Sequence, residues 1–350
     1  MVAQADARVL ARASNETNHV GNVAPTTQAN PYGLPPVTVV IPTRDRGDRV
    51  LGTLRSLLAG SLAPARVIVA DQSEDGSTEA ALAPFEADRQ VQCVRTTTTG
   101  ISAALNDGIA EAETELIAIT GDDCDVACTW LEELARELAA NPATGIVFGT
   151  VRPGRDAVDA RFTPSYVVSK RATARSMFAK HRVAGTSACM ALRKSVWAEL
   201  GGFDEMLGVG SPLRSAEEVD LTLRALLAGF EVCETPMAEV VHHGDFAHEE
   251  RGQLIGRNWY GTGAAFAKPL KMGRPEILVA LLGLSISWLR GGSRVAAGIA
   301  AGPFRLNSLT TFLRGAWTGL KQPVDRRRGH FTSDASRAAL PREGPARDSR

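Results

Sequence analysis

The segment Ile117-Ala-Ile-Thr-Gly-Asp-Asp-Cys-Asp125 decides both the fold and the position of the expected site. Its apolar run stops abruptly at Gly121, and two adjacent carboxylates follow, Asp122 and Asp123. Open α/β sheets bind ligands at the carboxyl ends of their strands. Paired carboxylates there are hard oxygen ligands, suited to Mg²⁺ or Mn²⁺ bridging a diphosphate. The alternative is a solvated turn in which Asp122 or Asp125 caps the helix predicted from Thr129.

Short β-branched runs alternate with amphipathic segments on both sides of this stretch. The first predicted strands are Val37–Ile41, Val67–Ala70, Val91–Val94 and Leu116–Thr120. Further strands are expected over 145–151, 186–192 and 231–241. Strands and helices joined by short links imply a mostly parallel sheet with right-handed crossovers. We therefore predict one α/β domain, Rossmann-like, with a sheet flanked by helices, over residues 37–245.

Composition divides the rest of the 350-residue chain. A hydrophobic content of 44% and a charged content of 22% predict a mostly globular protein. Residues 1–36 lack hydrophobic periodicity and are predicted to be disordered. Residues 251–350 hold 17 Lys and Arg against 5 Asp and Glu, although the whole chain has no net charge. We predict a helical extension over 246–320 and a disordered basic tail over 321–350.

Location and partners are constrained more weakly. Five cysteines, an odd number, and no recognisable secretion signal predict a cytoplasmic protein with reduced thiols. The uncharged segment Ile277–Leu289 has 13 residues, short of the ~20 that a membrane span needs. With Lys271 and Arg274 beside it, it fits an interfacial helix on an anionic leaflet or a core helix packed on the domain. We expect no nucleic-acid partner.

The loop after the first strand excludes two common nucleotide sites. It reads Pro42-Thr-Arg-Asp-Arg46, with neither GxGxxG nor GxxxxGK[ST]. The glycine-rich cradles of dinucleotide-binding and P-loop proteins are therefore absent. A bound diphosphate needs another source of positive charge, and a cation on Asp123 would supply it.

Glu218 admits two interpretations. Ser215 and Glu218 have the spacing of a capping box at a helix N-terminus, a purely structural role. The same carboxylate also follows the flexible loop Gly208-Val-Gly210, and a first-turn carboxylate there is well placed to meet a substrate hydroxyl. A general base needs that hydrogen-bond reach more than an unusual pKa.

The order of the motifs is more specific than any one of them. Seven segments occur in sequence: Val39-Val-Ile-Pro-Thr-Arg44, Asp71-Gln-Ser-Glu-Asp-Gly-Ser77, Gly100-Ile-Ser-Ala-Ala-Leu-Asn-Asp-Gly108, Gly121-Asp-Asp-Cys124 with Trp130-Leu131, Gly201-Gly-Phe-Asp-Glu205, Glu217-Glu-Val-Asp-Leu221 and Val241-His-His243. Together, over residues 37–245, they resemble the family-2 glycosyltransferases, inverting sugar-nucleotide enzymes of the GT-A fold.

The resemblance implies a role for each matching residue. Thr43, Arg44 and Asp71 would hold the nucleotide base and ribose, and Asp122 would lie against the nucleotide and sugar. Asn106 and Glu217 would add substrate contacts. The other implied roles are metal ligation by Asp123, proton abstraction from the acceptor by Glu218, and metal or diphosphate contacts by His242 or His243.

Three departures from the family pattern affect these roles. Gly121 stands where the DxD-like motif has its first acid, so metal ligation rests on Asp123. Glu218 is one methylene longer than the usual aspartate. Gln253, Arg257 and Trp259 do not have the QxxRW spacing of processive synthases, so we expect one sugar to be added.

The expected reaction is inverting transfer from a nucleotide-diphosphate sugar to a lipid-linked or saccharide acceptor, with Mg²⁺ or Mn²⁺. The expected process is cell-surface polysaccharide or glycolipid synthesis, at the inner face of the plasma membrane through peripheral contact. Two alternatives stay open. A sugar-nucleotide nucleotidyltransferase would need a glycine-rich basic first loop, which is absent, and a sugar-nucleotide-binding protein would lack transfer activity.

Overall fold

The computed structural model describes residues 31–86, 90–154, 161–244, 246–247, 249–289 and 306–332. The disorder predicted for residues 1–36 and for the end of the tail therefore falls almost wholly outside the described residues.

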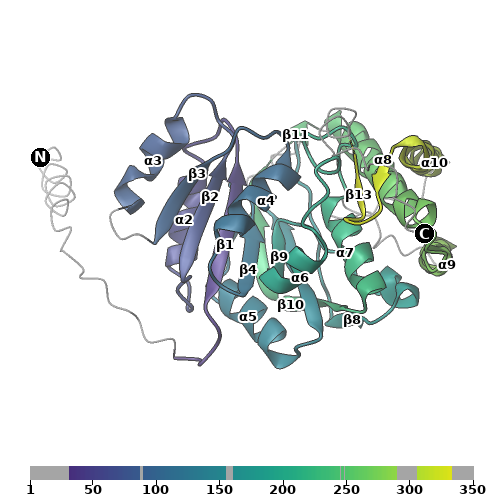
Figure 1. Cartoon of the computed structure of the whole chain (residues 1–350). Coiled ribbons are helices and arrows are strands. Elements are labelled where there is room, and N and C mark those ends of the chain that lie inside the picture. Colours follow the sequence, from purple (N-terminus) through teal and green to yellow (C-terminus); the bar gives the residue numbers. More distant parts are fainter. Residues whose placement is uncertain are drawn as a thin grey trace, which may run out of the picture. The chain divides into compact units, whose positions relative to one another are not determined.

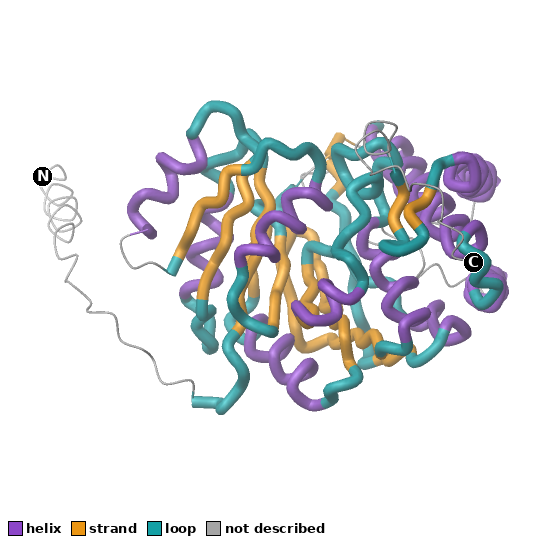
Figure 2. The backbone as a smooth tube through the Cα atoms, in the orientation of Figure 1, coloured by secondary structure: helices purple, strands orange, loops and turns teal. Residues whose placement is uncertain are grey.

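Among the described residues, nine strands form one central sheet (Figures 1 and 2). Their order is β3-β2-β1-β4-β9-β6-β10-β5, and β8 also pairs with β10. The bounds are β1 Val37–Thr43, β2 Arg66–Asp71, β3 Val91–Arg95, β4 Leu116–Thr120, β5 Cys124–Val126, β6 Thr144–Pro153, β8 Ala172–Ala174, β9 Cys189–Arg193 and β10 Glu231–His242. This confirms the predicted α/β fold with a mostly parallel sheet.

Strand direction changes at β9, and β5 and β8 also run antiparallel to their neighbour β10. The strands β1 to β4 pair in parallel, and so do β6 and β10. The strand β9 runs antiparallel to both of its neighbours, β4 and β6. Between β6 and β9 the described residues form β7 (Arg161–Phe162), β8 and the 3₁₀ helix η1 (Met177–Arg182), and none of them forms an α-helix. After this connection the chain enters β9 in the direction opposite to that of β6.

Helices cover both faces of the sheet because side chains alternate along each strand. In β1, Val39 and Ile41 pack in the cluster that contains α2 and α5, whereas Val40 packs in the cluster that contains α4 and α7. The helices on the first face are α2 (Val50–Leu58), α3 (Ser77–Glu86) and α5 (Trp130–Ala140). Those on the second face are α4 (Ile101–Glu111), α6 (Lys194–Glu199) and α7 (Glu217–Ala228).

Among the described residues that follow the sheet there are three helices: α8 (Glu250–Lys271), α9 (Ile277–Leu289) and α10 (Leu306–Lys321). The helix α8 lies between α9 and α10 and contacts α7 (Figure 1). Glycines allow α8 and α10 to approach, since a Cβ on Gly263 would collide with the backbone of Phe312, and one on Gly315 with that of Tyr260. None of the described helices has the length and apolarity to cross a membrane. A short strand β11 (Phe246–Ala247) pairs with β7.

The prediction that disorder begins at residue 321 was wrong for its first residues. The strands β12 (Val324–Asp325) and β13 (His330–Phe331) pair as a hairpin. The ring of Phe331 is buried, and its backbone N–H donates to Asp204 Oδ2 at 2.8 Å. The prediction followed the basic composition of the tail and did not take account of the apolar Phe331, whose burial holds the hairpin on the domain.

Phe331 adjoins a buried ion network. Lys268 of α8 is fully buried, with its Nζ 2.5 Å from Asp204 Oδ2 and 2.6 Å from Asp220 Oδ1. Asp220 Oδ2 also accepts a hydrogen bond from Arg224 Nε at 2.8 Å. A buried charge is tolerated only when it is paired and hydrogen-bonded. The network therefore fixes α7, α8 and the hairpin to one another.

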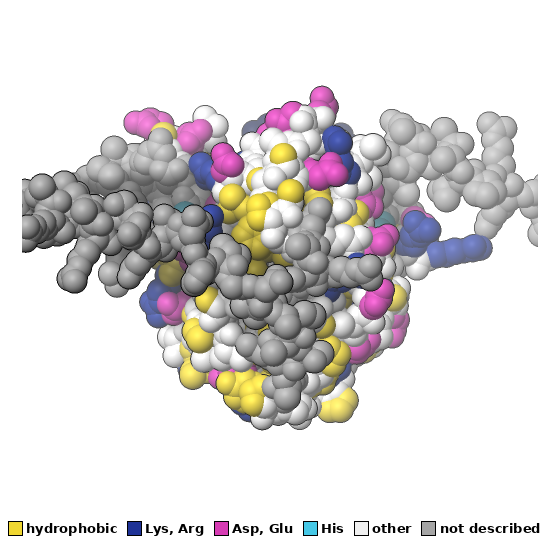
Figure 3. Space-filling model, turned by 90° about the vertical axis from the view of Figure 1, so that its left-hand side faces the viewer, with side chains coloured by type: hydrophobic (Ala, Val, Ile, Leu, Met, Phe, Trp, Pro, Cys, Tyr) yellow, Lys and Arg dark blue, Asp and Glu magenta, His cyan; other side chains and the backbone are white. Residues whose placement is uncertain are grey.

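The surface at the β3 end of the sheet has no single sign of charge. Figure 3 shows acidic and basic side chains mixed there with small hydrophobic groups.

Candidate active site

A cavity of about 600 Å³ lies at the carboxyl ends of β1 and β4. Because these strands are parallel neighbours, the residues that follow them emerge at the same edge of the sheet. The cavity is lined by the loops after β1, β2 and β4, the start of α4, the segment before β9, the loop before α7, the segment from the end of β10 to β11, and Arg257 of α8. The cavity thus lies at the edge of the sheet where the sequence predicts a ligand site.

The first carboxylate is fixed by a threonine. Thr43 Oγ1 donates to Asp122 Oδ2 at 2.6 Å. Burial raises the pKa of Asp122, and the hydrogen bond from Thr43 opposes that rise. Neither Asp122 nor Asp125 caps α5, whose N-cap residue is Thr129 and has no side-chain capping bond. The solvated-turn alternative is therefore not what the structure shows.

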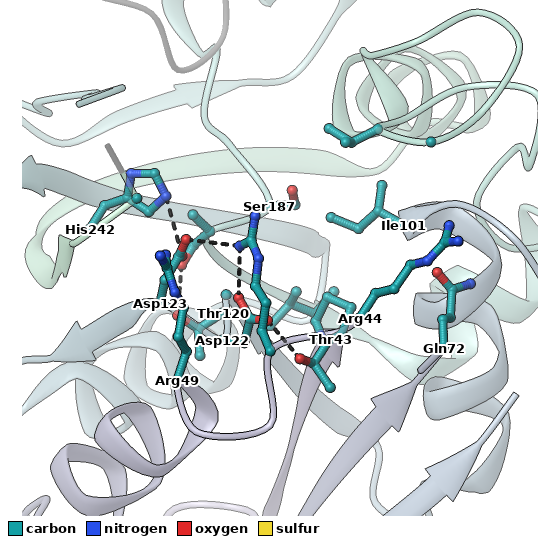
Figure 4. Close-up of a pocket in the computed structure, with 18 of the residues that line it drawn as sticks. Thr43, Arg44, Arg49, Gln72, Ile101, Thr120, Asp122, Asp123, Ser187 and His242 are labelled. Atoms are coloured by element: carbon teal, nitrogen blue, oxygen red, sulfur yellow. Dashed lines mark hydrogen bonds and ion pairs between the residues drawn. The ribbon is translucent and has the colours of Figure 1, made fainter. Parts of the chain in front are cut away.

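The second carboxylate faces a histidine. His242 Nε2 lies 3.3 Å from Asp123 Oδ1, and Figure 4 shows the two side chains pointing toward one another. The ligand atoms of Asp123, Cys124 and His242 lie within 4.8 Å of one another. Burial raises the pKa of the Cys124 thiol, and a sulfur ligand is soft, whereas Mg²⁺ and Mn²⁺ prefer oxygen ligands. Asp123 and His242 are the pair able to hold a divalent ion.

Space for an ion at this pair depends on Gly244. A Cβ at Gly244 would lie 2.7 Å from Asp123 Oδ2 and 2.8 Å from His242 Nε2. Any larger residue would fill the gap between the ligand atoms. His242 Nδ1 is buried and has no hydrogen-bond partner among the described residues. The donor set and the open space fit a divalent ion.

His243 is placed elsewhere, which corrects its expected role as a metal ligand. Its Nε2 lies 2.8 Å from Asp125 Oδ2, and its side chain does not line the cavity. Adjacent residues at a strand end point to opposite sides.

Cations surround the carboxylates. Arg46 Nη1 lies 3.4 Å from Asp122 Oδ1 and 3.3 Å from Asp123 Oδ2. Arg44 and Arg49 also line the cavity, and Arg44 lies at the end away from His242, near Gln72 (Figure 4). An anionic ligand such as a diphosphate would meet positive charge along this wall.

Asp71 lies behind the cavity rather than on its surface. It is fully buried, and its Oδ1 accepts hydrogen bonds from Ser73 N at 2.9 Å and Ser73 Oγ at 2.5 Å. Its Oδ2 has no hydrogen-bond partner in the part of the chain that the structure describes. Gln72, the next residue, lines the cavity and donates to the carbonyl of Gly100 at 3.0 Å.

Asn106 is not a cavity residue, which corrects its expected substrate contact. Its Nδ2 donates to the carbonyl of Phe203 at 2.9 Å, and its Oδ1 accepts from Phe203 N at 2.8 Å and Trp197 Nε1 at 3.2 Å. Both ends of the amide are used to hold the turn after α6. Its role here is to fasten that turn to α4.

The acidic pair of α7 lies just behind the cavity wall. Glu217 and Glu218 are each 5% exposed, and neither lines the cavity. Ser187, which does line it, donates from Oγ to Glu217 Oε1 at 3.0 Å. The predicted capping box is not formed, because Ser215 Oγ instead donates to Asn258 Oδ1 at 2.8 Å. The N-cap residue of α7 is Ala216, in a left-handed conformation with φ 75° and no side-chain cap.

Burial dominates the titration of this pair. It raises the pKa of Glu217, and it raises that of Glu218 further, with the charge of Glu217 adding to the effect. A hydrogen bond between the two carboxyl groups lowers the pKa of Glu217 and raises that of Glu218. Burial therefore favours a proton held by this pair, with Glu218 the member whose pKa is raised more. Lys180 interacts electrostatically with Glu218, and burial lowers its own pKa to about 8.

No role was assigned from the sequence to several polar residues of the cavity, among them Arg46, Arg49, Ser187 and Arg257. Arg46 and Arg49 could have been predicted, because they follow the end of β1 in sequence as Arg44 does. Ser187 and Arg257 had no such signal in the sequence, because their positions depend on how β9 and α8 pack beside α7.

Comparison with known proteins agrees with this geometry. Residues 38–200 match the model of the family described as Glycosyl transferase family 2. The O-antigen biosynthesis protein RfbC of Myxococcus xanthus is 27% identical over 60% of this chain. The pre-mycofactocin glycosyltransferase of Mycobacterium tuberculosis is 29% identical over 72% of it. The chain spans only 17% of the first relative's length and 52% of the second's.

A solved structure shows the same fold. The mannosyltransferase PcManGT of Pyrobaculum calidifontis, in complex with GDP-Man and Mn²⁺, superposes with a TM-score of 0.54 at 20% identity. The superposition covers 83% of this chain and 88% of that one. The architecture around the cavity is therefore the GT-A architecture.

Proposed function

Since the chain belongs to the family-2 glycosyltransferases, we propose that it transfers one sugar from a nucleotide-diphosphate donor to a hydroxyl acceptor, with inversion at the anomeric carbon. The observation that carries this proposal is the cavity that joins the Asp123–His242 pair to a wall of arginines, with a carboxyl pair behind Ser187. The process that this reaction would serve is polysaccharide or glycolipid synthesis.

A divalent ion, Mg²⁺ or Mn²⁺, would be held by Asp123 and His242. When bound, it would act as a Lewis acid that neutralises charge on the leaving diphosphate. Arg46 and Arg49 would contact the same phosphates from the cavity wall. The complex of PcManGT with Mn²⁺ supports the choice of a divalent ion.

The nucleoside would lie toward Arg44 and Gln72, at the end of the cavity away from His242. Thr43 and Asp71 would act there indirectly. Thr43 orients Asp122, and Asp71 holds the loop that carries Gln72.

The proton of the acceptor would be taken by the carboxyl pair Glu217–Glu218. In a buried site the raised pKa values make this pair a better proton acceptor than an exposed glutamate. The sequence assigned the base to Glu218, and that assignment stays a prediction. Separate Gln variants of the two residues distinguish them.

A ligand screen tests the proposed function. Thermal shift with UDP, GDP, dTDP and CDP, each with and without Mn²⁺, should show one nucleotide that stabilises only with the metal. The matching sugar nucleotides should then release nucleoside diphosphate and free sugar. A pyrophosphate-exchange reaction would instead indicate a nucleotidyltransferase, and binding without turnover would indicate a binding protein.

We also propose that α9 and α10 contact an anionic membrane surface. The buried residues Ile277, Ala280 and Leu284 pack α9 onto the domain, as the core-helix alternative predicted, yet its other side is exposed. The exposed apolar residues are Leu278, Val279 and Leu282 on α9, and Leu313, Trp317 and Leu320 on α10. Neither helix contains an acidic residue, and Lys321 Nζ lies over the Trp317 ring at 4.7 Å. Apolar side chains beside cations suit a headgroup boundary.

Flotation with phosphatidylglycerol-containing vesicles tests this contact. The wild-type protein should float, and a variant with Leu313, Trp317 and Leu320 changed to Ser should stay at the bottom of the gradient. Equal flotation of both proteins, or none by either, would contradict the proposed contact.

A further inference from the structure

We propose that Ser187 relays the proton of the attacking hydroxyl from the cavity to Glu217, so that Glu217 rather than Glu218 receives it. This inference rests on the proposed glycosyl transfer and specifies how its proton leaves the site.

Position supports Ser187 as the link. Its side chain lies on the cavity wall across from Thr43 (Figure 4). Its Oγ lies 3.0 Å from Glu217 Oε1, within the range of a hydrogen bond. Glu217 itself does not line the cavity, so an acceptor hydroxyl meets the serine before it meets the carboxylate.

The surroundings of Glu217 leave it few other routes to the cavity. A Cβ at Gly208 would lie 3.4 Å from Glu217 Oε2, so the loop before α7 covers that oxygen. The next residues of the loop, Val209 and Gly210, line the cavity. The third neighbour, Arg257, lines the cavity and lowers the pKa of Glu217 by its charge, but guanidinium cannot accept a proton.

Glu218 faces a different partner. Its charge interactions are with Glu217 and with the buried Lys180 of η1. Lys180 Nζ donates to the carbonyl of Val183 at 2.9 Å, which keeps it on the side of η1. Glu218 is therefore a positioning residue that interacts with Glu217 and does not line the cavity.

The step balances in protons and electrons. The acceptor oxygen forms a bond to the anomeric carbon as its O–H proton passes to Ser187 Oγ. The original proton of Ser187 passes to Glu217 Oε1, so the serine ends neutral. The bond from the anomeric carbon to the diphosphate oxygen breaks, and its electron pair leaves with the nucleoside diphosphate.

Water can serve as the test acceptor, because it must lose its proton by the same route. The probe is whichever of UDP-glucose, UDP-N-acetylglucosamine, GDP-mannose and dTDP-rhamnose the full-length wild type hydrolyses fastest with Mn²⁺. The variants are Ser187→Ala, Ser187→Thr, Glu217→Gln, Glu218→Gln and the double variant Ser187→Ala with Glu217→Gln. Affinity for the product nucleoside diphosphate, measured by calorimetry, serves as the control for folding and donor binding.

We expect Ser187→Ala and Glu217→Gln each to lower kcat by about 10²-fold, at the lower end of general-base effects, with KM and product affinity unchanged. Ser187→Thr, which keeps a hydroxyl, should retain most of the activity. The double variant should be no slower than Glu217→Gln alone, because both changes interrupt one route.

Ser187→Ala with wild-type kcat would overturn the relay, and so would losses that multiply in the double variant. A larger loss in Glu218→Gln than in Glu217→Gln would return the base to Glu218. The relay and the proposed function fail differently. A wild type that neither binds nucleoside diphosphates nor hydrolyses any donor contradicts the function itself. Normal hydrolysis by both the wild type and Ser187→Ala contradicts only the relay.

Discussion

His242 Nε2 lies 3.3 Å from Asp123 Oδ1, although the two residues come from distant parts of the chain. The sheet brings them together, because β10 pairs antiparallel with β5 and places His242 opposite Cys124. The backbone N–H of His243 also donates to the carbonyl of Asp123 at 2.8 Å. The imidazole of His242 thus lies beside the carboxylate of Asp123, the proposed metal ligand. Gly121 stands at the position where the DxD-like motif has its first acid, so it offers no carboxylate ligand.

Gly244→Ala should weaken Mn²⁺ binding. The added methyl would lie 2.7 Å from Asp123 Oδ2, so either the carboxylate or the loop must move. We expect at least a tenfold rise in the Mn²⁺ dissociation constant, about 1.4 kcal/mol, measured by electron paramagnetic resonance of free Mn²⁺. Gly256→Ala is the matched control, since a Cβ there meets no atom within 4 Å. Equal affinities for the two variants would count against an ion at this position.

Arg46→Ala should strengthen Mn²⁺ binding in the absence of nucleotide. The guanidinium lies within 3.4 Å of both carboxylates and competes with an added cation. Because the Arg46 side chain is 49% exposed, the gain should be only about 1 kcal/mol or less. The same titration, repeated in higher salt, should show a smaller difference between variant and wild type. Weaker Mn²⁺ binding by the variant would contradict the competition.

Lys268→Ala should destabilise the fold strongly. Removing this fully buried amine leaves Asp204 and Asp220 without the charge that faces both. The loss of one partner from a buried ion pair typically costs about 3–5 kcal/mol in the free energy of unfolding. Urea denaturation measures it, with Arg274→Ala as the control, because that arginine pairs with Glu276 at the surface. A loss as small as the control's would mean that the network contributes little.

Glu218→Gln should raise stability at neutral pH more than at acid pH. A carboxyl whose pKa is raised by folding binds its proton more tightly in the folded state, so stability falls as pH rises from the unfolded value, about 4.3, toward the folded value. Glutamine removes that penalty, which is absent below pH 4. Denaturation of variant and wild type at pH 4 and pH 8 should therefore show the gain mainly at pH 8. The exposed Glu79→Gln is the control, and a gain that is equal at both pH values would contradict the assignment.

The local pattern of residues predicted what depends on neighbours in sequence. The strand Leu116–Thr120 was predicted with the same bounds that the structure shows. A short apolar run bounded by polar residues is typical of a buried strand in an α/β protein. The carboxylates after it were placed correctly at the edge of the sheet. The order of motifs identified the family, because each motif marks a different loop of the same edge.

What the sequence did not reveal depends on packing between distant segments. Ser215 has the spacing of a capping residue, but Asn258 of α8 binds its hydroxyl instead. Asn106 has a motif position typical of substrate contact, but the turn at Phe203 occupies its amide. Ser187 and Arg257 reach the cavity only because β9 and α8 lie beside α7. No local periodicity encodes these contacts.

Binding of the nucleoside diphosphate selected by the thermal-shift screen, measured by calorimetry with and without Mn²⁺, tests the metal site most directly. Wild type and His243→Ala should bind it only with Mn²⁺, because His243 pairs with Asp125 outside the cavity. Asp123→Ala should lose the metal-dependent binding, and His242→Ala should weaken it. Unchanged Mn²⁺-dependent binding by Asp123→Ala would show that the ion, if it binds at all, is held somewhere else.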